Sequence, residues 1–536
     1  LERFRRMLTQ NNWAFTYAFD YDGRPESLRG IEETAYSSGY HATSVARPSV
    51  LVVGVGGGFD VLTALAFNAS RVTGVEVNAA TMDILTRVYR DYFRSWVEDA
   101  RVTLVADEGR HYLASSATNF DIIQLSGVDS YSGMPGAAHV FSESYLYTAE
   151  AFDLYLSRLS PAGILCLMRV EYVVPCDMLR ALVTAAGALR RAGVERPADH
   201  VMMLSEVTGH YAALLVKRTP FTAGERERLA TWAAQNRFLR LAAAPGGNDP
   251  QGNMYQRFLA LGGPQAEAAF VRSYPFDVSP VNDDRPFFFK NSFWWHLVTS
   301  DPVLKQYSLP VMEYSLLMLL AIIGVACVAC VYVPLRLLEG RSRKVPAGSF
   351  RYGAFFSGIG LGYLAVEMAL LQKFGLFLGH PNYSLSVVLA SLLLSTGLGS
   401  LFSRAILTGL GNLRVVSYVL AALVLAEHTL LLPKMAGLIR LPFPTRVLIV
   451  MSSVAPLGLC LGTFFPTALE RLKSTAPTFV PWAWGINGIF SVLAPVLSVG
   501  VSMTWGINAL LLGAVPVYVF AALAIPQPAI VADAPT

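Results

Sequence analysis

Charged residues are scarce in this sequence. Asp, Glu, Lys and Arg make up only 15% of the 536 residues, whereas hydrophobic residues make up 53%, and the mean hydropathy is +0.44. Soluble globular domains carry roughly 25% charged residues, so this balance excludes an ordinary soluble protein. We therefore expect part of the chain to lie in a lipid bilayer.

Long basic runs and metal-binding spacings are also missing. The formal net charge is only +4, and no block of Lys and Arg indicates that the chain binds nucleic acid. The five cysteines are odd in number and scattered, which argues against a disulfide framework and against a metal site. Cys327 and Cys330 form a CxxC pair, but they lie in an apolar helical stretch and are interpreted as small packing residues.

The first six residues, LERFRR, lack the form of a secretory signal peptide. Because the sequence starts with Leu1 and not with Met, we expect it to be part of a longer chain. Residues 1–48 are interpreted as a lead-in to the first domain.

The composition of the chain changes near residue 310. Before this point, apolar runs of strand length alternate with helical patterns, which predicts an α/β Rossmann-like domain with a doubly wound sheet. We place this binding domain at residues 49–220 and a polar connector at 221–310, with an amphipathic helix around 226–241 and a Pro/Asp turn at 278–286. The predicted strands are residues 51–53, 72–77, 102–105, 121–125 and 164–168.

The second half contains long hydrophobic runs, each close to the roughly 20 residues that a membrane-spanning helix needs. They predict an all-α polytopic transmembrane bundle of about seven helices over residues 311–526, followed by a tail at 527–536. The predicted spans are residues 312–335, 352–379, 383–404, 413–433, 443–468, 482–503 and 505–524.

A glycine turn follows the first predicted strand, in the stretch SVLVVGVGGGFDVL. Its glycines, at positions 54, 56, 57 and 58, let the backbone approach a ligand closely, and the next helix offers unpaired N–H groups. Glu76 ends the next strand, about 20 residues on, where an acidic side chain conventionally binds ribose hydroxyls. The pattern indicates a nucleotide-type ligand.

Two further polar segments follow later strands. Asp107, Glu108 and Gly109 come after the third strand and suit an adenine amino group, and the strand at 120–125 ends in Ser126 and Asp129. Ligands bind at the carboxyl ends of strands in open α/β sheets. Four such features on successive strands favour an adenosine-containing ligand over a nicotinamide or flavin cofactor and over a plain tight turn.

The order of these motifs resembles the spermidine synthase branch of the S-adenosylmethionine-dependent methyltransferase fold. The resemblance rests on VTGVEVN, DEG before RHYL, FDIIQLSGVDS and YLYTAEAFDLYLSRLSPAGILCL, and it covers roughly residues 35–215. The second half, with WAWGINGIFSV, resembles large bacterial membrane proteins that carry a spermidine-synthase-like domain. The resemblance implies S-adenosylmethionine or its decarboxylated form as the donor, and no metal.

The resemblance also implies roles for individual residues. It places the glycines of the turn around the methionine-like tail of the donor, Glu76 on the ribose and Glu108 beside the adenine, with Asp107 and Gly109 next to it. Tyr40 and the following His41 resemble the family's Tyr-His pair at the active site. The glycines in question are Gly54, Gly56 and Gly58.

The sequence departs from the family at the two carboxylates that aminopropyl transfer requires. Aminopropyl transfer needs one carboxylate to hold the donor's ammonium and another to deprotonate the attacking amine. The family has these carboxylates where this sequence has Gly57 and Ser126, while Asp60 and Asp129 remain nearby. The resemblance therefore implies an intact donor pocket and compromised aminopropyl chemistry.

Three functions follow from this pattern. A methyl-type group is transferred from S-adenosylmethionine, with Asp129 as base or orienting group. Alternatively, Asp60 replaces the lost carboxylate and the protein is a polyamine aminopropyltransferase. In the third case the domain senses an adenosyl ligand and regulates a transporter-like membrane module. The expected partners are the lipid bilayer and a small acceptor that is an amine or a lipid-soluble molecule, with no nucleic acid; the sequence names neither the acceptor nor an oligomeric state.

Ionisable residues within the predicted spans are functional candidates, because charges are costly in lipid. Glu367 lies in the second span, and Glu427 and His428 lie in the fourth; pairing with a Lys or His on a neighbouring helix is the structural alternative. The Lys and Arg of the short loops, taken literally, place the soluble domain outside. Because adenosyl donors are made in the cytosol and long domains largely escape this rule, we expect a multi-pass cell (inner) membrane protein with a cytoplasmic domain.

Overall fold

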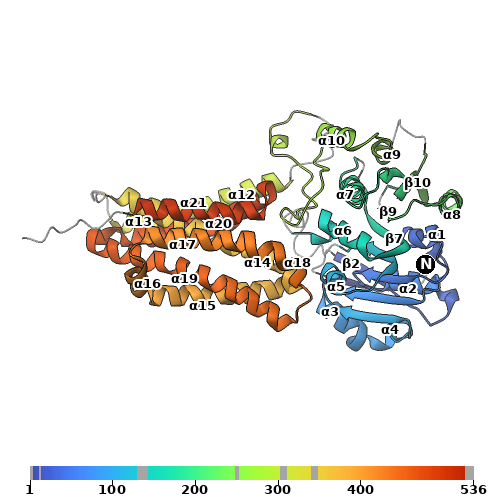
Figure 1. The fold of residues 1–536 in the computed structure, drawn as a ribbon, viewed down its shortest axis with the longest axis horizontal. Helices are drawn as coiled ribbons and strands as arrows, with labels where there is room; N and C mark the ends of the chain where they lie inside the picture. Colours follow the sequence, from blue (N-terminus) through green and yellow to red (C-terminus); the bar gives the residue numbers. More distant parts are fainter. Residues whose placement is uncertain are drawn as a thin grey trace, which may run out of the picture. The chain divides into compact units, whose positions relative to one another are not determined.

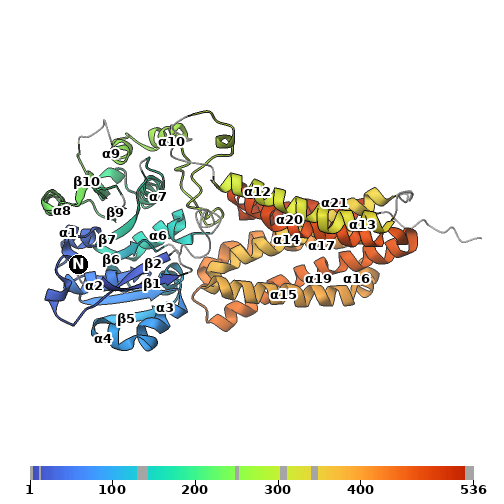
Figure 2. The same ribbon diagram turned by 180° about the vertical axis from the view of Figure 1, so that it is seen from behind.

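The computed structural model describes residues 4–10, 14–128, 143–172, 174–209, 211–247, 253–301, 311–339 and 348–525. The chain divides into two compact units, Leu1–Glu313 and Tyr314–Thr536. Figures 1 and 2 show the elements of each unit from opposite sides.

An eight-stranded mixed sheet forms the centre of the N-terminal unit (Figure 1), with the strand order β10-β8-β9-β7-β6-β3-β4-β5. The strands β3 to β7 are parallel, and β9, β8 and β10 extend one side of the sheet in antiparallel pairing. The predicted doubly wound sheet is confirmed, and the antiparallel strands are an addition to it. The strands are β3 Ser49–Val53, β4 Arg71–Glu76, β5 Val102–Ala106, β6 Phe120–Ser126, β7 Leu159–Val170, β8 Val201–Glu206, β9 Tyr211–Lys217 and β10 Leu239–Ala243.

Helices cover both faces of this sheet. Successive side chains of a strand point to opposite faces. Val50 and Val52 of β3 accordingly belong to a core that includes residues of α2 (Phe59–Ala66) and α4 (Arg90–Val97). Leu51 and Val53 belong to another core, which includes residues of α6 (Ala149–Arg158) and α7 (Asp177–Arg191). The remaining helices before the edge strands are α1 Ser38–Ala42, α3 Ala79–Asp83 and α5 Gly109–Ser115.

The segment 221–310, for which the sequence predicts a connector, contributes to the N-terminal unit. β10 joins the sheet beside β8, and Phe276 and Phe288 are fully buried in its core. The helix expected around 226–241 is shorter: α8 spans Ala223–Gln235, and the chain is a strand from Leu239. Pairing with β8 satisfies the backbone groups of this stretch and outweighs its helical pattern. Two short helices follow, α9 Met254–Leu259 and α10 Pro264–Ser273.

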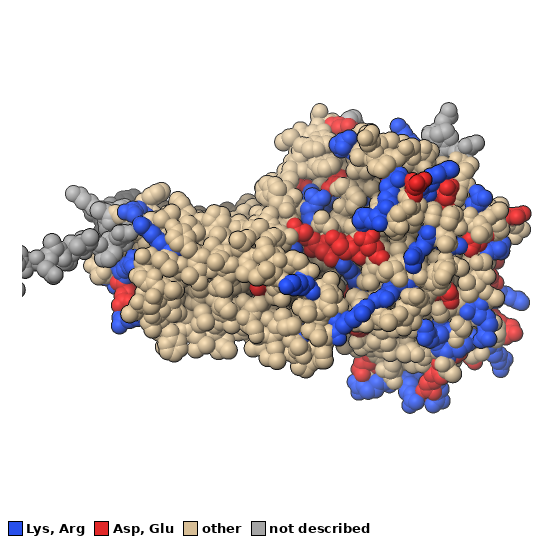
Figure 3. All heavy atoms as spheres, viewed as in Figure 1, with Lys and Arg blue, Asp and Glu red and all other residues tan. Residues whose placement is uncertain are grey.

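Among the described residues, seven helices between Met312 and Ala524 are long and apolar enough to span a membrane, as the sequence predicts. Figure 3 shows that the visible surface of the C-terminal unit is mostly uncharged, with charged side chains mainly near its ends. Its composition and helices support a membrane protein. The spans are Met312–Leu337, Ser349–Leu378 (α14), Pro381–Leu401 (α15), Leu413–Leu438, Phe443–Thr475 (α19), Pro477–Trp505 and Ile507–Ala524 (α21).

Candidate functional site

The strand order reverses direction between β3 and β6. The chain proceeds from β3 to β4 on one side and later returns to β6 on the other side of β3. In open α/β sheets, ligands bind outside the carboxyl ends of the strands at such a switch point. The glycine turn follows β3, and Ser126 ends β6, so both predicted features lie at this switch point.

The glycine turn has the backbone conformation that its glycines permit. Gly54, Gly56 and Gly58 have φ values of +79°, +50° and +91°, a region that other residues rarely adopt. A Cβ at Gly58 would overlap the ring of Trp96, so the turn also packs closely on α4. Gly58 precedes the first residue of α2, and the N-terminal end of this helix therefore lies at the glycine turn.

Gly57 is enclosed by an N-terminal hairpin of β1 (Phe4–Gln10) and β2 (Ala14–Phe19). Its N–H donates to Thr16 Oγ1 at 3.0 Å. A Cβ at position 57 would overlap the carbonyl oxygen of Tyr17. The position at which the spermidine synthases have a carboxylate therefore has no space for a side chain here.

Glu76 links the second strand to the glycine turn. Its Oε2 accepts from the Gly56 N–H at 3.0 Å, and its Oε1 accepts from the Asn78 N–H at 2.9 Å. An ionised carboxylate has about four acceptor positions, so Glu76 retains capacity for two hydroxyl groups. Its chemistry and place fit the ribose of an adenosyl donor.

Asp107 and Glu108, which follow β5, form hydrogen bonds at the start of α5. Glu108 is the N-cap of this helix and accepts from the His111 N–H at 2.7 Å; burial raises the pKa of Glu108 above its usual value. Asp107 Oδ1 accepts from the Glu108 N–H and lies 2.8 Å from His111 Nδ1. A Cβ at Gly109 would overlap Val53, so this glycine allows α5 to approach β3.

Asp60 and Ser126 are hydrogen-bonded at the carboxyl end of β6. The Ser126 hydroxyl donates to Asp60 Oδ1 at 3.0 Å, and the Gln124 amide donates to the same oxygen at 3.3 Å. Asp60 is 5% exposed; burial raises its pKa to about 7, although the bonds from Ser126 and Gln124 oppose the shift. Such a carboxyl exchanges a proton near neutral pH, which suits a general base.

Tyr40 lies near Asp60, but the cavity that it lines is at the other end of the sheet's strands. Its hydroxyl is buried and has no hydrogen-bond partner within the described residues, and burial together with the Asp60 charge raises its pKa. Its ring lines a cavity of about 960 Å³ with His41, Phe67 and Trp232. Because other lining residues directly precede β3, this cavity is at the amino ends of the strands and not at the glycine turn.

The structure thus brings together most of the predicted site. The glycine turn, Glu76 and the Asp60–Ser126 pair are linked around the ends of β3, β4 and β6. Asp129, predicted as a catalytic residue, lies outside the described residues. Among the described residues, no group of three or more His, Cys, Asp or Glu side chains could hold a metal ion.

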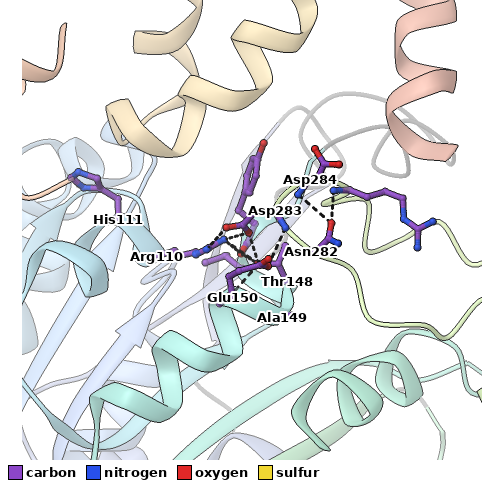
Figure 4. Close-up of polar contacts among 12 residues, drawn as sticks. Arg110, His111, Thr148, Ala149, Glu150, Asn282, Asp283 and Asp284 are labelled. Atoms are coloured by element: carbon purple, nitrogen blue, oxygen red, sulfur yellow. Dashed lines mark hydrogen bonds and ion pairs between the residues drawn. The ribbon is translucent and has the colours of Figure 1, made fainter. Parts of the chain in front are cut away.

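An ion pair near α5 was not predicted from the sequence (Figure 4). Arg110, 6% exposed, makes a bidentate pair with Asp283 at 2.5 and 2.6 Å, and Thr148 donates to Asp283 at 2.8 Å. Glu150 accepts from the Asp283 N–H at 3.0 Å. The ion pair therefore attaches the Pro/Asp turn around Asp283 to the first turn of α5, two residues after Glu108. The sequence signal for this contact was the polar composition of the Pro/Asp turn.

Comparisons with known proteins agree with part of this picture. No family model matches the chain. Polyamine aminopropyltransferase 2 of Pseudomonas aeruginosa is 25% identical over 185 residues, which are 32% of this chain and 51% of that protein. The polyamine aminopropyltransferase of Thermococcus onnurineus is 25% identical over 170 residues, or 29% of this chain and 59% of that protein. The chain thus spans only about half the length of these curated relatives, and the predicted spermidine-synthase resemblance is confirmed over that part.

Solved structures with low overall similarity include human methyltransferase-like protein 13 in complex with SAH, at 17% identity and a TM-score of 0.29, covering 38% of this chain and 91% of that one. The spermidine synthase of Thermotoga maritima has 13% identity and a TM-score of 0.28, covering 44% of this chain and 79% of that one. The fold is assigned from the observed strand order.

Proposed function

We propose that the N-terminal unit is a transferase that binds S-adenosylmethionine or decarboxylated S-adenosylmethionine and passes a methyl-type group to a small acceptor. The arrangement of the glycine turn, Glu76 and Ser126 at the ends of adjacent strands supports an adenosyl donor. The partial relationship to two aminopropyltransferases supports transferase chemistry.

The enclosure of Gly57 is the observation that favours methyl-type transfer. An aminopropyl donor ends in an ammonium group, which the family holds with a carboxylate at this position. The Tyr17 carbonyl oxygen occupies the space of any side chain at position 57. S-adenosylmethionine carries its own carboxylate, which backbone N–H groups can bind at a helix N-terminus.

The Asp60–Ser126 pair supplies the proton chemistry in this proposal. An amine or hydroxyl acceptor must lose a proton when it attacks the donor. Ser126 lies at the carboxyl end of β6, and it passes its hydroxyl proton to Asp60 as it takes the acceptor's proton. Asp129, as in the prediction from the sequence, is a second candidate for orienting the acceptor.

Aminopropyl transfer to a polyamine is the second candidate, and the two curated relatives favour it. In this case Asp60 replaces a missing carboxylate. Asp60, however, is buried and accepts hydrogen bonds from Ser126 and Gln124 of β6. It does not bond to the Gly57 N–H, which donates to Thr16. For this reason the geometry favours the first candidate.

The remaining proposals concern location and partners. The seven apolar helices support a multi-pass membrane protein, and we place it in the cell (inner) membrane with the N-terminal unit in the cytoplasm, where adenosyl donors are made. The acceptor is an amine or a lipid-soluble molecule that reaches the site from the bilayer, and nucleic acid is not a partner. Protease treatment of intact cells tests the orientation: cleavage of the N-terminal unit from outside would overturn it.

Calorimetric binding to the purified full chain tests the function. We expect S-adenosylmethionine to bind more tightly than decarboxylated S-adenosylmethionine and methylthioadenosine, and Glu76→Ala to weaken binding by at least about tenfold, because a charge-assisted hydrogen bond contributes about 1.5 to 3 kcal/mol. Glu98→Ala is the matched control, since Glu98 is exposed and pairs with Arg90 on the surface. Tighter binding of the decarboxylated form would replace the first candidate with the second. Failure of all three ligands to bind would exclude both, whereas binding without transfer to any acceptor would favour the sensing role.

A further inference from the structure

The membrane unit contains a buried acidic residue near the middle of its fourth span. Glu427 lies within the span Leu413–Leu438 and is 6% exposed. A carboxylate buried in an apolar span is costly, so ionisable residues at such positions are candidates for binding or moving a ligand.

The backbone is irregular at the same residue. The helix α17 (Leu413–Ala426) changes at Glu427 into a π-helical turn, η10, that spans Glu427–Leu431. Turns of this type are rare and occur frequently at functional sites. The burial of Glu427 and the local change of helix type are independent observations at one position.

Glu427 has an unused oxygen. Among the described residues, Glu427 Oε1 and the neighbouring His428 Nδ1 are buried atoms without a hydrogen-bond partner. A hydrogen bond joins the Glu427 side chain to Ser453 of α19. A buried polar atom without a partner is costly, which makes Glu427 a candidate binding position.

Among the described residues, the helices α19 and α21, which pack on α17, have no charged side chain near Glu427. The charged residues of α19 are near its ends, where Arg446 donates to the Phe377 carbonyl and Glu470 pairs with Arg404. The sequence of α21 contains no charged residue, and its one titratable group, Tyr518, packs on Phe464. The titratable groups next to Glu427 along the chain are His428 and, seven residues on, Lys434 in η11 (Leu432–Lys434).

The number of ligands available decides which cation fits. Metal ions such as Mg²⁺ and Ca²⁺ take roughly six or more oxygen ligands, and the described residues contain no group of three or more metal-binding side chains. A proton requires only the carboxylate. A carboxyl that is buried in apolar surroundings is neutralised by binding a proton.

We propose that Glu427 is a reversible proton-binding site of the membrane unit. The protonated carboxyl is accommodated in the apolar bundle, and it releases the proton when the bundle admits water to this position. The membrane unit is then proton-responsive, which is an activity separate from the transferase chemistry of the N-terminal unit. The proposal does not rest on the proposed function.

Labelling with dicyclohexylcarbodiimide tests the proposal, because this apolar reagent modifies protonated carboxyls in apolar surroundings. The full chain is treated in lipid vesicles and digested with trypsin. The peptide 415–434 contains Glu427 as its only acidic residue, and the peptide 447–471 contains only Glu470. Glu470 is exposed and ion-paired, and its peptide is therefore an internal control.

We expect label on the peptide 415–434 that falls at least about tenfold as the pH rises from about 5 to about 9, and little label on the control peptide at neutral pH. Absence of label on 415–434 at every pH, or a level that does not change with pH, would overturn the proposal. Infrared difference spectroscopy gives a second readout. The carbonyl band of a protonated carboxyl is expected in the wild type and absent from Glu427→Gln; identical spectra would also overturn it.

Discussion

The Ser126 hydroxyl donates a hydrogen bond to the Asp60 carboxylate at 3.0 Å, which connects the end of β6 to the first turn of α2. The resemblance to the spermidine synthases implies that Ser126 occupies a position at which they have a carboxylate. In this chain, Ser126 and the buried Asp60 that it bonds to together replace the carboxylate with which the family contacts its substrate.

Replacement of Asp60 by Asn is expected to lower the rate of group transfer by about 100-fold, because general-base contributions are typically of this size or larger. Since burial raises the Asp60 pKa to about 7, the wild-type rate rises as the pH increases through 7 and Asp60 ionises. The variant's residual rate lacks this rise. Steady-state rates across this pH range check the prediction; an unchanged pH profile in Asp60→Asn would show that Asp60 is not the base.

The same carboxyl affects stability in the opposite direction. The folded pKa of about 7 lies above the usual value of 3.8, so the folded state binds the proton more tightly than the unfolded state. The stabilisation is complete below about pH 4 and is lost as the pH rises toward 7, by up to about 1.4 kcal/mol per pH unit. Hydrogen exchange of β6 amides, compared between wild type and Asp60→Asn at each pH, checks this; a constant ratio of exchange rates would contradict it.

Replacement of Gly57 by Ala is expected to displace β2 and weaken donor binding by about tenfold or more. The new Cβ overlaps the Tyr17 carbonyl oxygen, and overpacking of this kind costs about 1 to 3 kcal/mol. For the same reason, Gly57→Asp does not produce an aminopropyltransferase. Calorimetric donor binding measures the effect. Gly262→Ala is the control, because a Cβ at Gly262 meets no atom within 4 Å; equal affinities for the two variants would refute the steric explanation.

Removal of the Asp283 charge is expected to loosen the Pro/Asp turn. Asp283→Asn leaves Arg110 buried without its carboxylate, which costs about 2 to 4 kcal/mol, less than for a fully buried pair because Asp283 is partly exposed. Hydrogen exchange of α5 and residues 278–286 should become about 30-fold faster or more. Asp153→Asn breaks an exposed pair with Arg191 and should change exchange little. Comparable effects of the two variants would contradict a special role for the Arg110–Asp283 pair.

The contact between α15 and α19 depends on glycine. A Cβ at Gly458 would overlap the Ser395 hydroxyl, and a Cβ at Gly462 would overlap the Thr396 carbonyl oxygen. Small residues permit such close approach of helices in membranes. We expect Gly458→Ala to lower the thermal unfolding midpoint of the full chain in detergent, as overpacking costs about 1 to 3 kcal/mol. Gly375→Ala, where a Cβ meets nothing within 4 Å, should have little effect, and a larger loss in this control would exclude the packing explanation.

The predicted strands and spans are properties of short stretches of sequence, and this is why they were predictable. The run before Gly54 forms β3, and the runs after residue 310 form seven apolar helices. The antiparallel strands were missed because β10 depends on pairing with β8, more than 30 residues earlier in the chain. The cavity beside Tyr40 has no local signal, since α1 and α8 contribute to it together.

The sequence by itself determined that the chain joins an α/β unit with a glycine turn to a bundle of apolar helices, because periodicity, glycine and hydrophobic length act over short distances along the chain. Only the tertiary structure decided which residues of the site are in contact, which are buried and where a side chain has space. Asp60 and Ser126 are 66 residues apart and Arg110 and Asp283 are 173 apart, and the space at Gly57 is closed by β2. Burial and long-range contacts, which set the Asp60 pKa and exclude a side chain at position 57, exist only in the folded chain.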